Sequence, residues 1–110
     1  MKSPRFVGTV RTDLARFPKA ARLRAGHELY MVQVGREPAD WRPMPSIGPG
    51  ACEIRVRVAA GALRVFYVAR LGDAMYVLHA CRKTTAHTAR RDIALAMQRY
   101  REAQADALAR

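Results

Sequence analysis

The sequence places three arginines and a histidine in neighbouring segments that resemble strands. Arg55 and Arg57 alternate with apolar residues in the run CEIRVRV, Arg64 interrupts the apolar run LRVFYV, and His79 stands in YVLHAC. Guanidinium groups bind phosphate through paired hydrogen bonds. Cleavage of RNA by its own 2′-hydroxyl needs a stabilised phosphate and two proton transfers. These residue types therefore predict chemistry on an RNA phosphate.

The segments that carry these residues have the pattern of an antiparallel meander. Strand-like runs cover 52–58, 63–71 and 75–81, and polar and apolar residues alternate strictly in the first of them. Two tight turns are expected, one at Ala60–Gly61 and one at Gly72–Asp73.

Turns at these places would bring the candidate residues to one face of the sheet. Arg57 would then lie opposite Arg64, and Arg55 opposite Phe66. Phe66 would in turn lie opposite His79, and its ring or that of Tyr67 would offer a base a stacking surface. A slip of one residue, or a bulge, would scatter this set.

Each of these residues also has a structural explanation. Arg55 and Arg57 fit the solvated face of an edge strand. Arg64 on an inner strand needs a partner, and Glu53 is the candidate for a buried salt bridge. His79 fits a hydrogen-bonded packing residue equally well. The sequence leaves these alternatives open.

The charge of the chain points to a polyanion. Twenty Lys and Arg residues oppose nine Asp and Glu residues, for a net charge of +11. Both halves of the chain carry the excess, which predicts attraction of nucleic acid to a folded domain rather than to a tail. An acidic protein partner would also suit this surface.

The remaining composition predicts a cytoplasmic protein without a zinc site or a disulfide framework. Cys52 and Cys81 lack the spacing of a zinc or disulfide motif and are expected to be small buried apolar residues. The N-terminus has no apolar stretch typical of a signal peptide, and no run has the length of a membrane span.

Two helices are expected around the meander. One runs from Pro18 to about Gln33 and ends at Gly35, after a short strand at residues 6–10 and a cap at Thr12 or Asp13. Its expected core positions are Ala20, Leu23, His27, Tyr30, Met31 and Val34. The other runs from Thr88 to about Leu108, with the stripe Ile93, Met97, Tyr100, Gln104 and Leu108.

These elements predict an α+β fold in one domain over residues 1–110, with helices packed on one side of a small, mostly antiparallel sheet. The proline-rich segment 35–51 is expected to be a loop held down by Trp41.

The order of three segments resembles the RelE/HigB-like toxin superfamily, in particular its phage-related HigB-like branch. These segments are WRPMPSIGPGACEIRVR, LRVFYVARLGDAMYVLHACRKTTAHT and RRDIALAMQRYRE, and the likeness covers about residues 10–103. Residues Leu63, Cys81, Arg82 and Thr84 depart from the usual pattern of the branch.

The resemblance implies a RelE-like fold and inhibition of translation by mRNA cleavage, often on the ribosome. It also implies a cognate antitoxin, commonly with a helix-turn-helix domain, and no metal or organic cofactor. Relatives carry basic functional residues at positions that match Arg55, Arg57, Arg64 and Lys83 here.

The sequence thus predicts the toxin of a type II toxin–antitoxin system, a metal-independent endoribonuclease. The general base is expected among His79, Lys83 and Glu53, in falling order. The alternatives are a ParE-like toxin that binds DNA gyrase and an inactive phage-derived protein that only binds a partner. The candidate catalytic residues are Arg64, Lys83, His79 and Arg55, and the candidate RNA-binding residues are Arg57, Phe66, Arg82, Arg90 and Tyr100.

Overall fold

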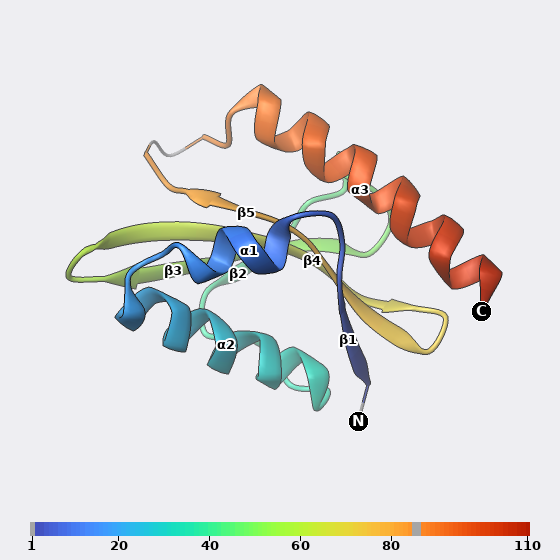
Figure 1. Ribbon diagram of the computed structural model, residues 1–110, viewed down its shortest axis with the longest axis horizontal. Helices are drawn as coiled ribbons and strands as arrows, with labels where there is room; N and C mark the ends of the chain where they lie inside the picture. Colours follow the sequence, from blue (N-terminus) through green and yellow to red (C-terminus); the bar gives the residue numbers. More distant parts are fainter. Residues whose placement is uncertain (1, 85–86) are drawn as a thin grey trace.

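A five-stranded sheet lies between helices in this computed structural model, which describes residues 2–84 and 87–110 (Figure 1). The strand order is β1-β5-β4-β3-β2, with β1 parallel to β5 and all other neighbours antiparallel. The elements in chain order are β1 (Ser3–Phe6), α1 (Val10–Ala15), α2 (Lys19–Gln33), β2 (Trp41–Pro43), β3 (Ala51–Val58), β4 (Gly61–Leu71), β5 (Ala74–Arg82) and α3 (Arg90–Ala109). The mixed α/β composition agrees with the expected α+β class.

The helices cover both faces of the sheet, so the expectation of helices on one side was wrong. Helices α1 and α2 pack on one face, and α3 packs on the other together with the segment that contains Met44 and Ile47 (Figure 1). The reason lies in β4 and β5, which are buried without a break over 63–68 and 74–80. Strands that are apolar on both faces need cover on both.

The meander forms as expected, with one change in register. Val58 pairs with Gly61, so the first hairpin turns at Ala59–Ala60 rather than at Ala60–Gly61. Arg55 therefore lies opposite Arg64, not opposite Phe66. Because side chains alternate with a period of two, this shift of two residues leaves every side chain on its expected face.

The second hairpin keeps the expected register through a bulge. Phe66 pairs with His79 and Tyr67 with Val77, which leaves Leu78 as an extra residue in β5. The Phe66–His79 pair precedes the bulge on the Arg64 side, so His79 stays on the same face as Arg64 and Arg55. This hairpin turns at Gly72–Asp73 as predicted, with Gly72 at φ +59.

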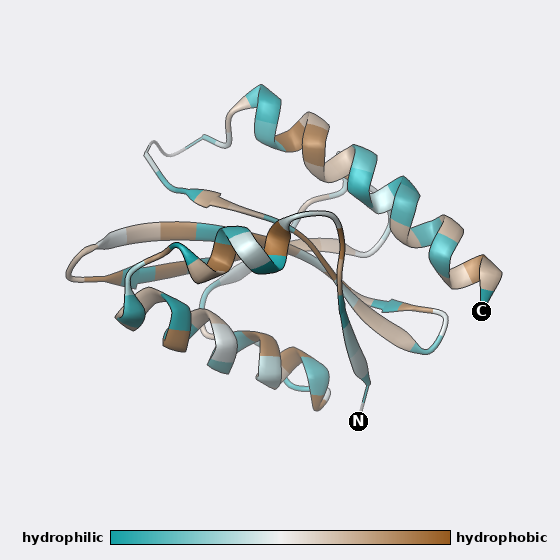
Figure 2. Ribbon diagram, in the orientation of Figure 1, coloured by the Kyte–Doolittle hydropathy of each residue, from teal (hydrophilic) through white to brown (hydrophobic). Residues whose placement is uncertain are grey.

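Both helices bury alanine-rich stripes instead of the stripes expected from the large apolar residues. Helix α2 buries Ala21, Ala25, Leu29 and Val32 together with Glu28, and α3 buries Ala96, Arg99, Tyr100 and Ala103. Small residues let a helix approach the sheet closely. A prediction based on the largest apolar side chains does not detect such a face. Figure 2 shows hydrophilic and hydrophobic segments alternating along α2 and α3. Tyr100 and the partly buried Ile93 are the correct members of the expected α3 stripe.

The ends of several elements differ from the sequence expectations. Strand β1 ends at Phe6, and Thr12 and Asp13 lie inside α1 rather than capping a helix. Helix α3 begins at Arg90, two residues after the expected cap Thr88. Residues 41–43 form the edge strand β2 beside β3, although the whole segment 35–51 was predicted to be a loop.

Helix α2 has the expected limits. It begins directly after Pro18 and runs to Gln33, and Gly35 takes a φ of +86 just beyond it. Among the residues that the structure describes, no helix is long and apolar enough to cross a membrane.

Candidate functional site

A cationic pocket of about 240 Å³ opens where the end of β5 meets the start of α3. Its cations are Arg64 from β4, Arg82 from the end of β5 and Arg91 from the first turn of α3. One carboxylate, Asp92, stands among them, so the lining carries a positive excess. Among the residues that the structure describes, the lining consists of Arg64, Cys81, Arg82, Thr84, His87, Thr88, Ala89, Arg91 and Asp92.

The floor of this pocket is fixed by a buried carboxylate. Glu53 has no exposed surface, and its Oε2 accepts a hydrogen bond of 2.8 Å from Arg64 Nη1. Arg42 Nε donates to the other oxygen at 2.9 Å, and the Thr88 hydroxyl donates to Oε2 at 3.2 Å. One carboxylate thus faces two guanidinium groups and a hydroxyl, so the floor keeps a positive excess while Arg64 is held rigidly.

Arg55 extends this network toward the sheet edge. Its Nη2 lies 3.3 Å from Asp40 Oδ1, and its Nε lies 3.8 Å from Glu53 Oε1. Arg55 Nε is buried and makes no hydrogen bond. Arg55 therefore sits behind the pocket as a structural cation and does not line it.

His79 and Asp92 form the wall between the pocket and the core. His79 Nε2 lies 2.8 Å from Asp92 Oδ1, and Arg99 Nη1 lies 3.3 Å from His79 Nδ1. A guanidinium can only donate, so Nδ1 accepts and we assign the ring proton to Nε2, which donates to Asp92. Both ring nitrogens are thereby engaged, and the His79 ring stacks on Phe66 at a centroid distance of 6.0 Å.

His79, Cys81 and Asp92 place their ligand atoms within 4.8 Å of one another, close enough to be tested as a metal site. The hydrogen-bond pattern does not fit a cation. The proton on His79 Nε2 occupies the lone pair that a metal would need, and Arg99 holds the ring in this form. Burial, followed by the field of Asp92, raises the pKa of the Cys81 thiol to about 12. The three groups fit a hydrogen-bonded wall.

The sequence of residues 12–101 matches the family described as Phage derived protein Gp49-like (DUF891). The chain belongs to this family. The family is related to the toxins of toxin–antitoxin systems. No curated protein matches the sequence. The matched segment of the Gp49-like protein contains the whole lining of the pocket.

Of the candidate residues in the Gp49-like protein, the structure brings Arg64 and Arg82 to the pocket. His79 stands behind it, with 6% of its surface exposed. Phe66 is fully buried, which leaves no ring face for a base. Tyr100 is also buried and donates its hydroxyl to the Pro49 carbonyl, so it packs the proline-rich segment onto α3.

The other candidates lie around the pocket rather than in it. Arg57 is exposed on β3 opposite Ala62, and Arg90 is exposed at the first position of α3. Lys83 is half-buried, and its backbone amide donates to the Ala62 carbonyl at 2.9 Å.

Sequence reasoning missed five polar side chains of the described lining: Thr84, His87, Thr88, Arg91 and Asp92. His87 is exposed, as expected for a loop residue, but it also faces the pocket. The polar stretch between the last strand and the helix that starts with RRD could have indicated these residues, because the N-terminus of a helix favours bound anions.

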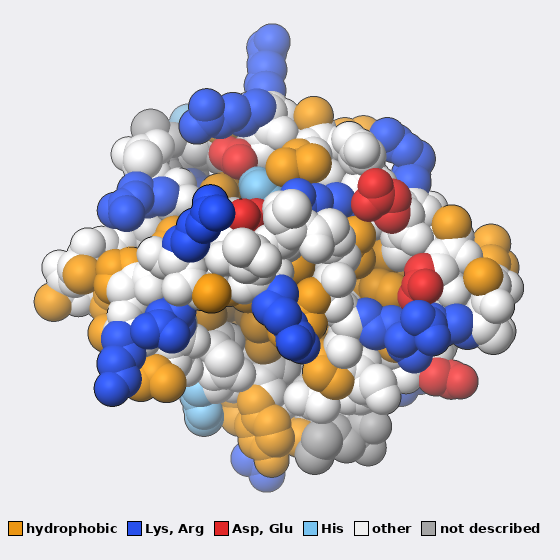
Figure 3. All heavy atoms as spheres, viewed as in Figure 1, with side chains coloured by type: hydrophobic (Ala, Val, Ile, Leu, Met, Phe, Trp, Pro, Cys, Tyr) orange, Lys and Arg blue, Asp and Glu red, His pale blue; other side chains and the backbone are white. Residues whose placement is uncertain are grey.

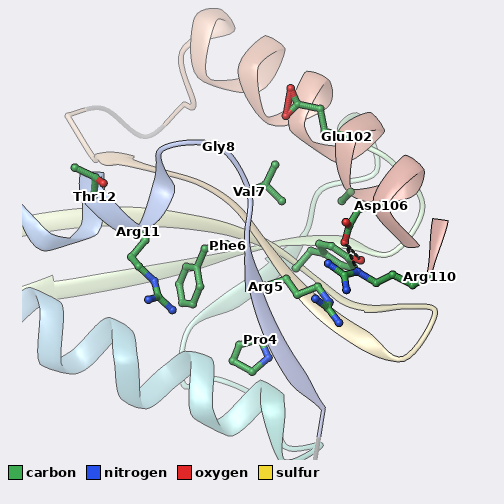
Figure 4. Close-up of a pocket in the computed structure, with 12 residues that line it drawn as sticks. Pro4, Arg5, Phe6, Val7, Gly8, Arg11, Thr12, Glu102, Asp106 and Arg110 are labelled. Carbon is green, nitrogen blue, oxygen red and sulfur yellow. Dashed lines mark hydrogen bonds and ion pairs between the residues drawn. The ribbon is translucent and has the colours of Figure 1, made fainter. Parts of the chain in front are cut away.

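A larger and more open cleft of about 650 Å³ lies between β1 and the C-terminal half of α3 (Figure 4). The Arg11 guanidinium lies 4.7 Å from the centroid of the Phe6 ring. Asp106 accepts hydrogen bonds from Tyr76 at 2.7 Å and from Arg110 at 2.9 Å. Two carboxylates, Asp106 and Glu102, stand among the three arginines of this cleft, so its lining carries a smaller positive excess than that of the pocket at α3.

Lys and Arg side chains are also distributed over the rest of the surface. Figure 3 shows them across the whole viewed face, with fewer acidic side chains among them. A basic surface of this kind attracts polyanions in general, and the pocket at α3 gathers three of its guanidinium groups in one place.

Proposed function

We propose that this Gp49-like protein is the toxin of a type II toxin–antitoxin pair that inhibits translation by cleaving mRNA, in association with the ribosome. The observation that carries the proposal is the pocket in which three guanidinium groups, two threonine hydroxyls and an imidazole converge. The relation of the family to toxins of toxin–antitoxin systems supports it. The cognate partner would be an antitoxin with a helix-turn-helix domain.

We assign the phosphate binding and the proton transfer of metal-independent cleavage to side chains of the pocket. Arg82 and Arg91 would bind the phosphate oxygens, and Arg64 would add fixed positive charge from below. The 2′-oxygen of the substrate attacks phosphorus, and the bond from phosphorus to the 5′-oxygen breaks. The products are a 2′,3′-cyclic phosphate and a 5′-hydroxyl.

His87 is the residue we assign to proton transfer. An imidazole accepts and donates protons near neutral pH, and His87 combines exposure with a place in the lining. It would take the proton of the 2′-hydroxyl, and the leaving 5′-oxygen would take a proton from water at the mouth of the pocket. Glu53 and His79 fit less well, because Glu53 is closed to solvent and His79 is only 6% exposed.

The test is inducible expression in a bacterial host with growth curves and mapping of RNA 5′ ends. Wild type should arrest growth and give new cuts inside translated messages. His87→Ala and Arg91→Ala should relieve arrest, whereas Arg70→Ala, which removes a charge far from the pocket, should not. Filamentation with DNA-damage signals would instead indicate a gyrase-directed toxin. Normal growth with well-folded protein would indicate a protein that only binds a partner.

A further inference from the structure

Helix α2 carries a second apolar stripe that the core does not use. Its inward side is buried through Ala21, Ala25, Leu29 and Val32. Its outward stripe consists of Ala20, Leu23, His27 and Tyr30, all exposed. Leu23 is 65% exposed and Tyr30 is 49% exposed, and these are two of the four large hydrophobic side chains that are exposed in the described part of the chain.

The spacing of the outward stripe is that of a helix-packing surface. Its members follow one another at intervals of three, four and three residues. This alternation is the a/d pattern by which one helix receives the knobs of another. Since a helix rises about 1.5 Å per residue, the stripe is roughly 15 Å long, enough for about three turns of a partner helix.

The charge beside the stripe decides which partner fits. Lys19, Arg22 and Arg24 are exposed on the same helix. The one acidic residue of α2, Glu28, is 4% exposed, and its carboxylate is held by Arg24 at 3.1 Å and by the backbone amide of Ala39 at 2.7 Å. A partner helix with acidic residues beside its apolar seam would complement these cations. A second copy of a chain with a net charge of +11 would repel them.

We propose that the outward stripe of α2 binds an acidic amphipathic helix of a partner protein. The stripe lies on the sheet face opposite α3, so the bound helix leaves the cationic pocket uncovered (Figure 1). The proposal rests on the proposed function only for the partner's identity as the antitoxin, because the binding surface itself does not depend on RNA cleavage.

The test uses a synthetic three-heptad helical peptide with Leu at a and d and Glu at e and g, added to the full chain labelled for NMR. Shifts should map to residues 19–34, and affinity should fall roughly tenfold or more in Leu23→Ser/Tyr30→Ser, as expected when two interface anchors are removed. The matched control, Met97→Ser/Leu108→Ser on α3, removes exposed apolar groups elsewhere and should bind like wild type.

Several results with the peptide would overturn the proposal. These are absence of binding, equal binding by the Leu23→Ser/Tyr30→Ser variant, equal binding of a charge-matched peptide with Ser at a and d, and shifts spread over the whole basic surface. Anionic vesicles or single-stranded RNA that shift residues 19–34 more strongly than the peptide would also contradict it, as would self-association through α2. RNA binding by Arg91→Ala, measured separately, reports on the pocket, so failure of the proposed function and failure of this surface are distinguishable.

Discussion

Arg64 and Glu53 form an ion pair that is closed to solvent. Arg64 Nη1 lies 2.8 Å from Glu53 Oε2, and the two side chains are 2% and 0% exposed. The pair joins β3 to β4 directly under the cationic pocket, so the same guanidinium holds the sheet together and charges the pocket floor. The two interpretations of Arg64 offered by the sequence, a salt bridge and a phosphate site, are therefore compatible.

Loss of the Arg64 side chain should destabilise the fold. Arg64→Ala leaves a buried carboxylate without its main partner, which costs about 3–5 kcal/mol. We expect the midpoint of urea unfolding to fall accordingly, while Arg57→Ala, exposed on the same sheet face, changes it by no more than about 0.5 kcal/mol. An Arg64→Ala variant as stable as wild type would contradict the structural role of the pair. Loss of toxicity in this variant alone would not assign Arg64 to catalysis.

Arg91 should contribute a phosphate contact. Arg91→Ala should weaken binding of a single-stranded RNA oligonucleotide and reduce the slope of log affinity against log salt by about 0.7, the value for one phosphate contact on a single strand. Fluorescence titrations at several salt concentrations measure both quantities. Arg70→Ala removes the same charge at the other end of β4 and should keep the wild-type slope. Equal losses in both variants would mean that RNA binds the general basic surface and not the pocket.

Cys81 should be unreactive in the folded protein. Burial is the main cause that raises the pKa of its thiol to about 12, so its thiolate fraction near neutral pH is about a thousandfold lower than for an ordinary cysteine. We expect slow modification by iodoacetamide in native protein and rapid modification in urea, measured by mass spectrometry of the Cys81 peptide. Rapid alkylation of the native protein would show that the wall of the pocket opens.

The same shift gives a pH dependence of stability. The folded state favours the protonated thiol, so above the ordinary thiol pKa the unfolded chain has lost a proton that the folded chain retains. The contribution of Cys81 to stability is therefore complete at neutral pH and declines as pH rises toward about 12. Cys81→Ala should lose less stability than wild type over this alkaline range, as followed by unfolding at a series of pH values. An identical decline in both proteins would contradict the shifted pKa.

The sequence predicts the meander and the face of each side chain, because a register error of two residues leaves side chains on the same face of a strand. Strict alternation from Cys52 to Val58 assigns each side chain to a face, and the wrong turn position at Ala60–Gly61 did not change that assignment. The prediction of the buried face of α2 was wrong, because Ala21 and Ala25 are buried against the sheet and Leu23 is exposed. The size of the side chains shows which helix face has the larger apolar area, but it does not show which face packs on the sheet.

The pocket itself could be predicted only in part, because it depends on contacts that are distant in sequence. Arg99 donates to the hydroxyl of Thr9 and to the carbonyl of Leu78, and so fixes where α3 lies against the N-terminal segment and β5. That placement brings His87 and Arg91 over Arg64. No local pattern encodes it, whereas the local excess of arginine is visible in the sequence.

Two glycines with opposite surroundings test how closely the helices pack. A Cβ at Gly48 would lie 2.7 Å from Tyr100 Cε1, whereas a Cβ at Gly26 in α2 would meet nothing within 4 Å. Gly48→Ala should therefore destabilise the fold by about 1–3 kcal/mol through overpacking, because the hydrogen bond from the Tyr100 hydroxyl to the Pro49 carbonyl holds the Tyr100 ring in place. Gly26→Ala should stabilise it by about 0.5–1 kcal/mol, because alanine restricts the unfolded chain and favours the helix. Thermal and urea unfolding of the two variants measure both effects. Loss of stability in Gly26→Ala would show that the outer side of α2 is more crowded than its exposure indicates, and a neutral Gly48→Ala would show that α3 can move away from the proline-rich segment.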